Sequence, residues 1–532
     1  MGDRPYIDAG VHAPPNTRYR DELTNYKIEP VTNEKGELKL GVHVGGGEVR
    51  MVEWAPQPGS QQAFLACPVS EVLLEGTRGG GKTDVLIMSF AQECGKGFGQ
   101  EWLGVVFRRS YPQLTDVINK ANKWFKRIFP RANYNKADHF WEWPDGEKLY
   151  LRHMNDREDY WNYHGWGLTW IGWEELTNWP DPSCYRAMLS CLRSTEEGIP
   201  RQVRSTCNPA GVGHNWVKAR WQLPYPERLI GNVLPPIGDP NKLDASEEFA
   251  LDRVSIHSDI RENLILLAAD PNYRLRIAAA ARNPNERKAW LYGSWDIVSG
   301  GMFDDLWNPK VHIVPGFPLE HLPRDWKVDR AYDHGQSRPF SVGWWAQSNG
   351  EPVEWEGRLY GTVKGDIYRI DEWYGWTGEP NEGVRMLSGD IAKGILDREK
   401  RMFPSRIGRV RPGPADASIF DRYEGEKSVA GDMEGEGVRW EAADKASGSR
   451  KHGWEQIRKH LKHAVPAEDG YREKPGMFIF AKCQQFIRTV PVLPRDDRDP
   501  DDVDTEAEDH IGDEVRYRCR AKTRVIRHGR FM

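Results

Sequence analysis

The stretch from Gly76 to Thr83 reads GTRGGGKT, and it constrains this chain of 532 residues more than any other segment. It follows the apolar run EVLLE and precedes DVLIMSF, so it is expected where a buried strand turns into a helix. Glycines let successive backbone N–H groups point inward at phosphate oxygens, and the N-terminus of the following helix adds positive charge. The spacing fits the phosphate-loop template G-x-x-x-x-G-K-[S/T] and predicts a nucleotide site. The alternative is a glycine-rich turn that contains a lysine by chance.

Each residue type in this loop has an expected task. Lys82 is expected on the β and γ phosphates of ATP, and Thr83 on the Mg²⁺ that accompanies ATP. Arg78 is a candidate for additional charge against the γ-phosphate, although a surface arginine beside a loop fits equally well. The residues expected to contact the nucleotide are Gly76, Arg78, Gly79, Gly80, Gly81, Lys82 and Thr83.

Length and composition set the frame for this motif. A chain of this length is too long for one hydrophobic core and predicts two to four domains. No apolar run approaches the roughly 20 residues that span a bilayer, and the start MGDRPYIDAGV lacks the pattern of a signal peptide, so we expect a cytosolic protein without a membrane partner. Seven cysteines without a C-x-x-C pair favour reduced thiols over disulfides or a zinc site. The net charge of −5 requires any nucleic-acid contact to come from local patches.

Changes of pattern divide the chain into four segments. Residues 1–50 are polar and glycine-rich and are expected to form an N-terminal arm, in which TNEKGELKLGVHVGGGEVRMV predicts either a hairpin or a flexible segment. Over 51–230, short apolar runs alternate with helical stretches, which predicts a parallel α/β sheet carrying the phosphate loop. Residues 231–318 are loop-rich around one predicted helix, YRLRIAAAARN, and are interpreted as a lid or linker. Residues 319–532 begin a second α/β domain, which ends in a basic tail.

The apolar runs predict the strands of both domains. In the first domain these are SEVLLEG, WLGVVFRR, KLYLRHM, LTWIGWEEL and RQVRSTCNP, and in the second they are KVDRAYDH, PFSVGWWAQ and DIYRIDEWY.

ATP hydrolysis needs one carboxylate behind Mg²⁺ and another that orients or deprotonates the attacking water. LTWIGWEEL supplies Glu174 as the metal-side acid and Glu175 as the base, at the end of an apolar strand. Two glutamates that open a helix are also ordinary helix-start chemistry. Asn208, with Ser205 and Thr206, ends another strand, where a polar group would sense the γ-phosphate and couple its loss to movement. The alternative there is a plain Asn-Pro turn.

Two pairs of polar residues near these strands have open roles. Gln61 or Gln62 would read adenine, because an amide offers both a donor and an acceptor, but either is equally a solvated helix residue. Arg108 and Arg109 are candidates for contact with DNA phosphates or with a neighbouring subunit's nucleotide, although solvated surface arginines are commoner.

The ordered set GTRGGGKT, WIGWEEL, STCNPAGVGHNWVK, GSWD, YDHG, GPADASIF and EDHIGDEVRY resembles the large terminase subunit of tailed bacteriophages. The resemblance covers most of the chain and implies an additional-strand-type P-loop ATPase domain followed by a ribonuclease H-like nuclease domain. Glu174 departs from the commoner Asp-Glu pattern, which leaves the Mg²⁺ geometry open. The partners that the resemblance implies are double-stranded DNA, a small terminase subunit, the portal protein of the procapsid and a homo-oligomeric ring of five subunits. It also implies action in the host cytoplasm and absence from the mature virion.

The second domain carries acids suited to two-metal chemistry. Hydrolysis of a phosphodiester by this route needs carboxylates that converge on two Mg²⁺ or Mn²⁺ ions about 4 Å apart. Asp333 in the first strand and Asp416 at the end of a later strand resemble the family's first two catalytic aspartates. Asp513 resembles the third metal ligand, with His510 and Asp509 as accessory groups.

Taken singly, each of these aspartates is more often a cap or a solvated residue, and the acidic run before Asp509 favours a solvated face there. Asp329 and Asp509 remain alternative ligands.

Basic residues of the second domain are expected to hold DNA by its backbone. They are Arg406, Arg409 and Arg411, and in the tail Arg516, Arg518, Arg520, Lys522, Arg524, Arg527 and Arg530. The resemblance thus implies a motor that drives double-stranded DNA into procapsids and cuts concatemers. The alternatives are a helicase-like or repair ATPase whose C-terminal domain binds DNA without cutting it, and a scaffold that keeps the folds without the chemistry.

Overall fold

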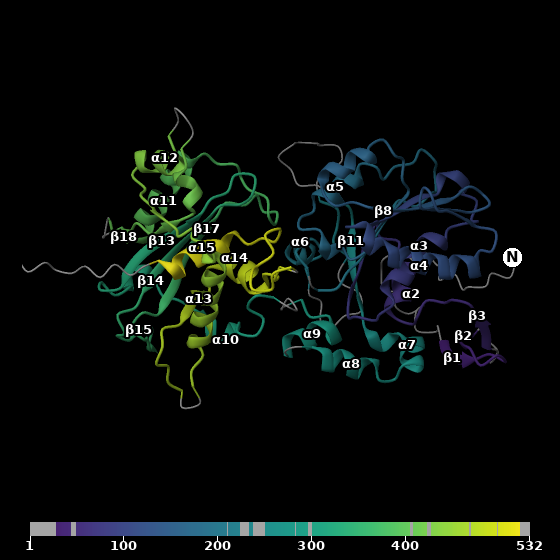
Figure 1. Ribbon diagram of the computed structural model, residues 1–532, viewed down its shortest axis with the longest axis horizontal. Helices are drawn as coiled ribbons and strands as arrows, with labels where there is room; N and C mark the ends of the chain where they lie inside the picture. Colours follow the sequence, from purple (N-terminus) through teal and green to yellow (C-terminus); the bar gives the residue numbers. More distant parts are fainter. Residues whose placement is uncertain are drawn as a thin grey trace, which may run out of the picture. The chain divides into compact units, whose positions relative to one another are not determined.

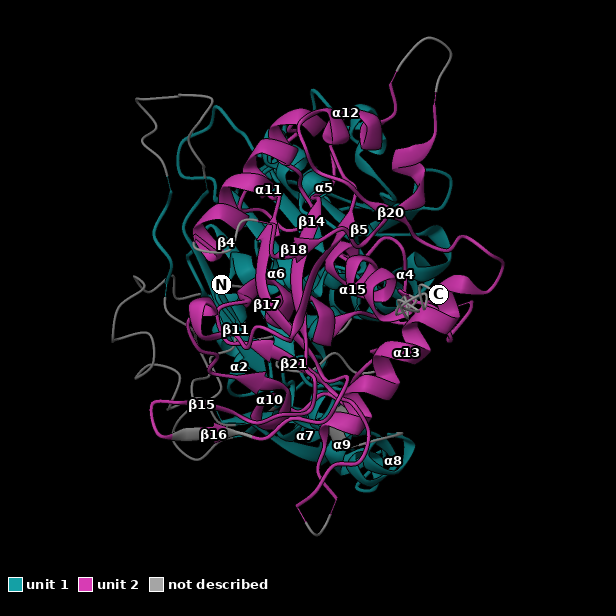
Figure 2. Cartoon of the chain, turned by 90° about the vertical axis from the view of Figure 1, so that its left-hand side faces the viewer, with its two compact units in different colours: residues 1–299 teal, residues 300–532 magenta. Residues whose placement is uncertain are grey.

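The chain divides into two compact units, Met1–Ser299 and Gly300–Met532 (Figure 2). We expected a lid or linker over 231–318, but the division falls before Met302 and Phe303, because both side chains are buried in the core of the second unit. The computed structural model describes residues 28–43, 49–209, 211–223, 233–237, 250–281, 284–295, 301–404, 408–422, 427–467, 470–496 and 498–521. Most of the predicted arm lies outside these residues.

An eight-stranded sheet forms the centre of the first unit (Figure 1). In spatial order its strands are β11 (Arg253–Ser258), β4 (Glu71–Gly76), β10 (Gln202–Thr206), β9 (Trp170–Trp173), β5 (Leu103–Arg108), β8 (Lys148–His153), β7 (Phe140–Glu142) and β6 (Asn133–Asn135). The first six strands run parallel to one another, β7 runs antiparallel to β8, and β6 runs antiparallel to β7. Strand β10 lies between the phosphate-loop strand β4 and the acid-bearing strand β9, which is the additional-strand arrangement expected.

Both faces of this sheet are buried, which explains the apolar runs in the sequence. On β4, Val72 and Leu74 belong to one core and Leu73 to the other. The first core is covered by α2 (Ser60–Ala66), α3 (Lys82–Ala91) and α4 (Tyr111–Ile128), and the second by α5 (Ser183–Leu189) and α6 (His214–Arg220).

Two smaller groups complete the first unit. The predicted hairpin is confirmed as part of an antiparallel sheet of β1 (Ile28–Thr32), β2 (Leu38–His43) and β3 (Val49–Val52). The predicted helix of the lid region is confirmed as α8 (Tyr273–Ala280), and together with α9 (Pro284–Tyr292) it lies at a small core of Ile260, Ile277 and Leu291. Helix α7 (Leu264–Ala269) packs instead on the core of the β1–β3 sheet, through Leu264 and Ile265.

The second unit is built on a mixed sheet (Figure 1). In spatial order its strands are β12 (Ile313–Val314), β21 (Met477–Phe480), β17 (Ile367–Tyr374), β14 (Ser341–Gln347), β13 (Lys327–Asp333), β19 (Pro414–Ala415) and β20 (Glu441–Ala442), and β18 (Val410–Arg411) also pairs with β13. Strands β13, β14 and β17 form an antiparallel meander, and β19 and β20 continue parallel to β13. This is the ribonuclease H-like order, so the expected fold class is confirmed.

Helices cover both faces of this sheet. Neighbouring residues of β14 mark the two sides: Trp344 donates to Glu399 on α11 (3.1 Å), whereas Trp345 donates to Glu514 on α15 (2.8 Å). The helices are α10 (Pro309–His312), α11 (Ser388–Met402), α12 (Val429–Gly435), α13 (Ser449–Ala464), α14 (Gln484–Thr489) and α15 (His510–Arg520), and a hairpin of β15 (Val353–Trp355) and β16 (Arg358–Tyr360) stands apart from the main sheet.

A buried ion pair attaches α15 to this sheet. Arg369 on β17 donates to Glu514 on α15, and both side chains are fully buried. Burial raises the pKa of Glu514, while Arg369 and the Trp345 indole act in the opposite direction. A Cβ on Gly343 would collide with the carboxylate oxygens of Glu514 and with the Arg369 guanidinium, so a larger residue at this point of β14 would displace the ion pair. The pair therefore fixes the position of α15, which carries His510 and Asp513.

Within the described residues, no helix has the length and apolarity needed to cross a membrane. The seven cysteines carry free thiols, and all but Cys519 are buried. Tryptophans mainly fill the cores. The largest fully buried side chains are Trp102, Trp141, Trp170, Trp173, Trp179, Trp216, Trp221, Trp295, Trp326, Trp344, Trp345 and Trp454.

Replacement of Arg369 by Met should destabilise the second unit by about 3 to 5 kcal/mol, because it leaves the Glu514 carboxylate buried without its partner. Urea unfolding followed by tryptophan fluorescence measures the change. The double variant Arg369→Met/Glu514→Leu should regain most of the loss. The control is Lys482→Met, which removes the partly exposed ion pair with Asp371 and should cost about 0 to 1 kcal/mol. Equal losses in both single variants would contradict the argument.

Candidate functional site

The predicted phosphate loop follows β4 and leads directly into α3. Gly76, Gly79 and Gly81 have φ angles of 130°, 80° and 73°, a region that side chains other than glycine rarely adopt. At Gly80 a Cβ would collide with the Ser258 hydroxyl of the neighbouring strand β11. The run of glycines is therefore required by the backbone, as the phosphate-loop interpretation predicted.

Lys82 is the first member of a chain of hydrogen bonds that joins three strand ends. Its side chain is only 8% exposed, and Nζ donates to the Thr77 carbonyl (2.7 Å) and to Oδ1 of Asn208 (2.8 Å). Nδ2 of Asn208 in turn donates to the two carboxylate oxygens of Glu175, at 3.0 and 3.2 Å. Burial lowers the pKa of Lys82, and the Glu175 carboxylate opposes that shift. The lysine is thus linked through one amide to the predicted base.

Thr83 and Glu174, the two residues expected around Mg²⁺, are in contact. The Thr83 hydroxyl donates to Oε1 of Glu174 (2.6 Å), and Arg108 forms an ion pair with Oε2 (2.5 Å). Burial and the neighbouring Glu175 raise the pKa of Glu174, while Arg108 and Thr83 act against this. Glu175 itself has a left-handed backbone with φ 56°, which turns it away from the direction of β9. The ion pair of Arg108 with Glu174 was missed by the sequence analysis.

Gln61 supports the phosphate loop from outside, and Arg78 lies within the loop. Nε2 of Gln61 donates to the Gly80 carbonyl (2.8 Å) and its Oε1 accepts from the Gln57 N–H (3.0 Å), so both ends of the amide are engaged. The side chain of Gln62 is buried beside it. The exposed Arg78 guanidinium stacks on the Trp290 ring of α9 at 4.0 Å. A role of these residues toward adenine or the γ-phosphate stays a prediction.

The structure also locates the other predicted polar residues at this edge of the first sheet. Ser205 and Thr206 are buried at the end of β10, and the Thr206 hydroxyl accepts from the Glu175 N–H at 3.5 Å. Arg109 donates to the Asn178 carbonyl (2.9 Å).

The segment interpreted as a lid contacts the loop, and no sequence pattern indicated which residues do so. Asn263 donates to the Gly79 carbonyl (2.7 Å), and the Thr77 N–H donates to the Ser258 carbonyl (2.9 Å). These bonds join residues about 180 positions apart, a separation at which local spacing carries no signal.

In the second unit, Asp333 and Asp416 end adjacent parallel strands. Tyr332 on β13 is in register with Ala415 on β19, and the Asp416 N–H donates to the Tyr332 carbonyl (3.0 Å). The two aspartates therefore leave the sheet at the same edge. Asp416 also accepts from the N–H (2.9 Å) and hydroxyl (2.7 Å) of Ser418 and so begins a short 3-10 helix.

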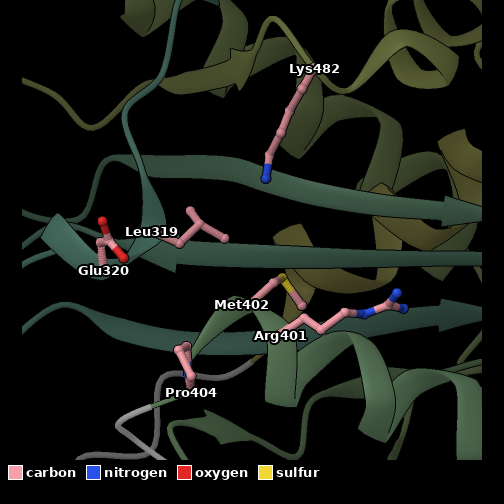
Figure 3. A pocket seen from close by; sticks show the side chains of 6 residues that line it. All are labelled: Leu319, Glu320, Arg401, Met402, Pro404 and Lys482. Atoms are coloured by element: carbon pink, nitrogen blue, oxygen red, sulfur yellow. The ribbon is translucent and has the colours of Figure 1, made fainter.

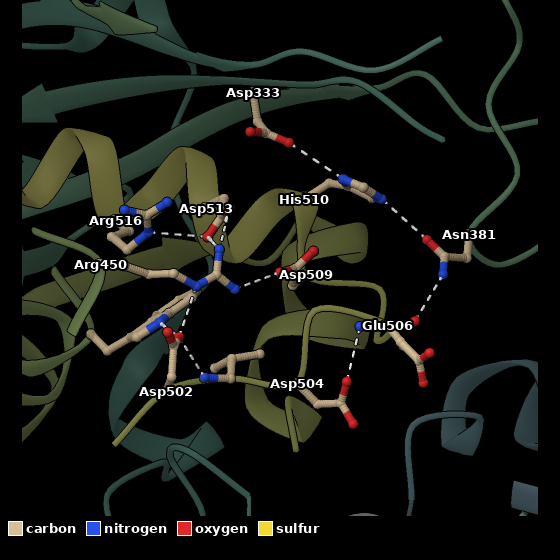
Figure 4. A network of polar contacts seen from close by, with 12 residues as sticks. Asp333, Asn381, Arg450, Asp502, Asp504, Glu506, Asp509, His510, Asp513 and Arg516 are labelled. Carbon is tan, nitrogen blue, oxygen red and sulfur yellow. Dashed lines mark hydrogen bonds and ion pairs between the residues drawn. The ribbon is translucent and has the colours of Figure 1, made fainter. Parts of the chain in front are cut away.

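Asp333 is buried against His510 (Figure 4). Nδ1 of His510 lies 3.3 Å from Oδ2 of Asp333, and Nε2 lies 3.1 Å from Oδ1 of Asn381. Burial raises the pKa of Asp333 to about 7, and the Asp513 carboxylate adds to the rise. Burial opposes protonation of His510, yet its bond to Asp333 and the nearby Asp509 raise its pKa. Asn381 is a partner that the sequence analysis missed.

The third predicted ligand, Asp513, is held by arginines (Figure 4). Arg450 on α13 donates to Asp513 (3.0 Å) and to Asp509 (2.9 Å), and Arg516 donates to Asp513 (3.0 Å). Burial and the Asp513 charge raise the pKa of Asp509 to about 6. Asp509 thus lies in the same network as Asp513.

The charges of all three predicted metal ligands influence the pKa of one tyrosine, Tyr517. Burial raises the pKa of the Tyr517 phenol, and Asp333, Asp513 and Asp416 each raise it further through their charge. Carboxylate oxygens are the donors that Mg²⁺ and Mn²⁺ prefer, and burial raises the pKa of Asp333 although His510 acts against that rise, so the donor set suits such ions. Among the described residues, however, no three His, Cys, Asp or Glu side chains are gathered closely enough to hold a metal ion.

Other predicted residues of the second unit are paired within the protein. Asp329, the alternative ligand, accepts from Arg518 (2.5 Å), and Arg520 pairs with Asp444 (2.6 Å). Arg516 and Arg518 are buried, so the expectation that they contact DNA phosphates is wrong: they belong to α15 and neutralise acids of the fold. The other residues of the predicted tail (Lys522, Arg524, Arg527 and Arg530) and Arg406 lie outside the described residues.

Two surface hollows lie elsewhere on the second unit. One, of about 300 Å³, is lined by none of the predicted site residues (Figure 3). Its lining is Leu319, Glu320, Arg401, Met402, Pro404 and Lys482. The other, of about 350 Å³, is lined in part by Arg324, Lys327 and the predicted DNA contacts Arg409 and Arg411. The basic character expected of those two positions is thus present at that surface.

Comparison with solved structures finds large terminases from several phages. The chain is similar to the large terminase of bacteriophage HK97 at 12% identity and a TM-score of 0.39, over 86% of this chain and 94% of that chain. It is similar to the large terminase of a thermophilic bacteriophage in complex with ADP at 16% identity and a TM-score of 0.35, over 86% and 97%. The nuclease domain of the P22 large terminase matches at 14% identity and a TM-score of 0.28, over 41% and 90%. No family model and no curated protein matches the chain. Because these scores are low, we base the function on the chain's own residues.

Replacement of Asp333 by Asn should stabilise the metal-free protein at alkaline pH. The folded pKa of Asp333, about 7, lies above the usual value of about 3.9, so the folded state binds the proton more tightly and stability falls as pH rises between these values. Asparagine carries no charge, so the variant should be more stable than the parent by about 1 to 3 kcal/mol near pH 8 and equally stable near pH 4. Urea unfolding in EDTA across this range measures the difference. The exposed Asp421→Asn is the control, and a constant difference for Asp333→Asn would refute the shift.

Proposed function

We propose that this chain is a large terminase subunit, which uses ATP to drive double-stranded viral DNA into procapsids and cuts concatemeric DNA with a metal-dependent nuclease. One observation carries the proposal: a single chain joins a phosphate loop linked to an acid pair with a second unit whose adjacent strands end in Asp333 and Asp416. The partners that follow from the motif resemblance are double-stranded DNA, a small terminase subunit, the portal protein and a ring of five subunits.

In the first unit, the proposed ATPase uses the residues at the ends of β4, β9 and β10. Backbone N–H groups of the loop and Lys82 bind the phosphates of ATP, and Thr83 and Glu174 hold Mg²⁺. Glu175 takes the proton of the attacking water. Asn208 bridges Lys82 and Glu175, so departure of the γ-phosphate changes the contacts of the lysine and, through the amide, the position of the base.

Arg108 neutralises Glu174, because it forms an ion pair with that carboxylate. The ion pair offsets part of the repulsion between the two adjacent glutamates. If Glu174 were to hold Mg²⁺, the Arg108 guanidinium would be free to contact another anion.

In the second unit, the proposed nuclease uses Asp333, Asp416 and Asp513 as metal ligands, with His510 and Asp509 as accessory groups. Two Mg²⁺ or Mn²⁺ ions bound there would activate water and stabilise the leaving oxygen of the phosphodiester. His510 holds Asp333 by one ring nitrogen and Asn381 by the other, which fixes the orientation of the carboxylate.

Lys82→Ala and Glu175→Gln should each abolish ATP hydrolysis, with a loss of at least about a hundredfold in kcat, because one removes the phosphate contact and the other the base. Release of inorganic phosphate by the full chain with Mg²⁺ and DNA measures the rate. Lys126→Ala and Glu196→Gln, changes at exposed positions of the same unit, are the matched controls and should keep the parental rate. Retained turnover in Lys82→Ala would remove the motor from the proposal.

Asp333→Asn and Asp416→Asn should each abolish nicking of plasmid DNA by the full chain with Mn²⁺ while leaving ATP hydrolysis intact, because the two centres use separate residues. Gel electrophoresis of the plasmid measures the cutting. Asp421→Asn, five residues beyond Asp416 and exposed, is the control and should cut normally. Persistent cutting in both variants would refute the nuclease assignment. Absence of cutting in the parent protein would favour the alternative of an ATPase whose C-terminal domain binds DNA without cutting it.

A further inference from the structure

Arg450, on the first turn of α13, contacts three aspartates at once (Figure 4). Its Nε donates to Asp502 (2.7 Å), Nη2 to Asp509 (2.9 Å) and Nη1 to Asp513, at 3.0 and 3.3 Å from the two oxygens. A guanidinium stays protonated at every physiological pH and donates in several directions, so it can neutralise several carboxylates together. One positive charge is thus built in where the proposed third metal ligand lies.

Asp513 has no oxygen left without a guanidinium. Oδ2 accepts from Arg450, and Oδ1 accepts both from Arg450 and from Nε of Arg516 (3.0 Å). Asp333 and Asp416, by contrast, have no arginine among their hydrogen-bond partners in the described part of the chain: Asp333 meets His510 and Asp416 meets Ser418. The first two proposed ligands are therefore open to a cation in a way that the third is not.

We propose that Arg450 competes with a divalent cation for Asp513, so that the site takes one ion at Asp333 and Asp416 more tightly than a second ion at Asp513. The inference rests on the proposed nuclease function and adds a control on its metal loading. A second ion must displace Nη1 of Arg450 from the carboxylate, and the attraction between guanidinium and carboxylate opposes that step.

Arg450 can affect metal binding in two opposite ways, and its loss would change the affinity for the metal ion in opposite directions. A neighbour that only orients a ligand strengthens metal binding, and its loss weakens that binding. A cation that occupies the ligand oxygens repels the metal and blocks it, and its loss strengthens binding. Contact with both oxygens of Asp513 favours the second effect.

The test is Mn²⁺ binding to the full chain, measured from free Mn²⁺ by electron paramagnetic resonance without DNA or nucleotide. Arg450→Gln should tighten binding of the second ion by about tenfold or more and leave the first ion unchanged. Arg450→Lys, which keeps the charge but cannot reach three carboxylates, should give a smaller increase. Arg458→Gln is the matched control, because it removes an ion pair with Asp305 from the same helix and should leave both affinities unchanged.

The outcomes separate this inference from the function on which it rests. An unchanged or weakened second ion in Arg450→Gln overturns the inference, even if the parent protein binds Mn²⁺ through Asp333. If Arg450→Gln fails to fold by circular dichroism, Arg450→Lys decides: no tightening there overturns the inference. Parent protein that binds no Mn²⁺, or binds it equally after Asp333→Asn and Asp416→Asn, overturns the proposed metal centre itself and the inference with it.

Discussion

Both centres depend on one geometric constraint: adjacent parallel strands end at the same edge of a sheet. In the first unit, Thr206 of β10 is in register with Leu74 of β4, so Asn208 and the loop after β4 emerge together. Strand β9 is likewise in register with β10, which brings Glu175 to the same edge. In the second unit, the register of Tyr332 with Ala415 does the same for the two aspartates that follow. A shift of one residue in any of these pairings would turn the site residue to the opposite face.

Because these edges collect acids, each centre also needs internal cations to remain folded. Burial raises the pKa of Glu174 and of Asp333, which means that the ionised forms cost stability. In the first unit, Arg108 offsets part of that cost by direct contact, and Lys82 reaches the acids through Asn208. In the second unit, Asp333 is paired with His510, whereas Asp509 and Asp513 have Arg450. The cations are thus distributed unevenly among these carboxylates.

The sequence was sufficient to predict the strands that consist mainly of buried apolar residues. Apolar runs placed β4, β5, β8, β9, β10, β13, β14 and β17, and the glycine spacing placed the loop. The sequence was insufficient to predict polar or very short strands that complete a sheet. Strand β11 alternates polar and apolar residues and lies inside the segment predicted as a lid. Strands β19 and β20 have two residues each, which is too short for a periodic pattern. The stretch before Met302 and Phe303 is glycine-rich and resembles a linker, so the sequence did not indicate that these two residues belong to the core of the second unit. Partners such as Arg518 for Asp329, or Arg450 for Asp513, are far apart in sequence, and charge alone does not say which acid an arginine will meet.

The two centres therefore differ in how they are held. Lys82, Asn208 and Glu175 sit within a few residues of strand ends in one continuous sheet, so sheet pairing alone brings them together. His510 and Asp513 sit on a helix, and no strand register fixes that helix. Its position comes from packing on β13 and β14 and from the buried pair of Glu514 with Arg369. Since Glu514 directly follows Asp513, a change that loosens the pair moves the proposed ligand itself. Stability of the second unit and the position of the proposed ligand Asp513 are consequently coupled through one turn of α15.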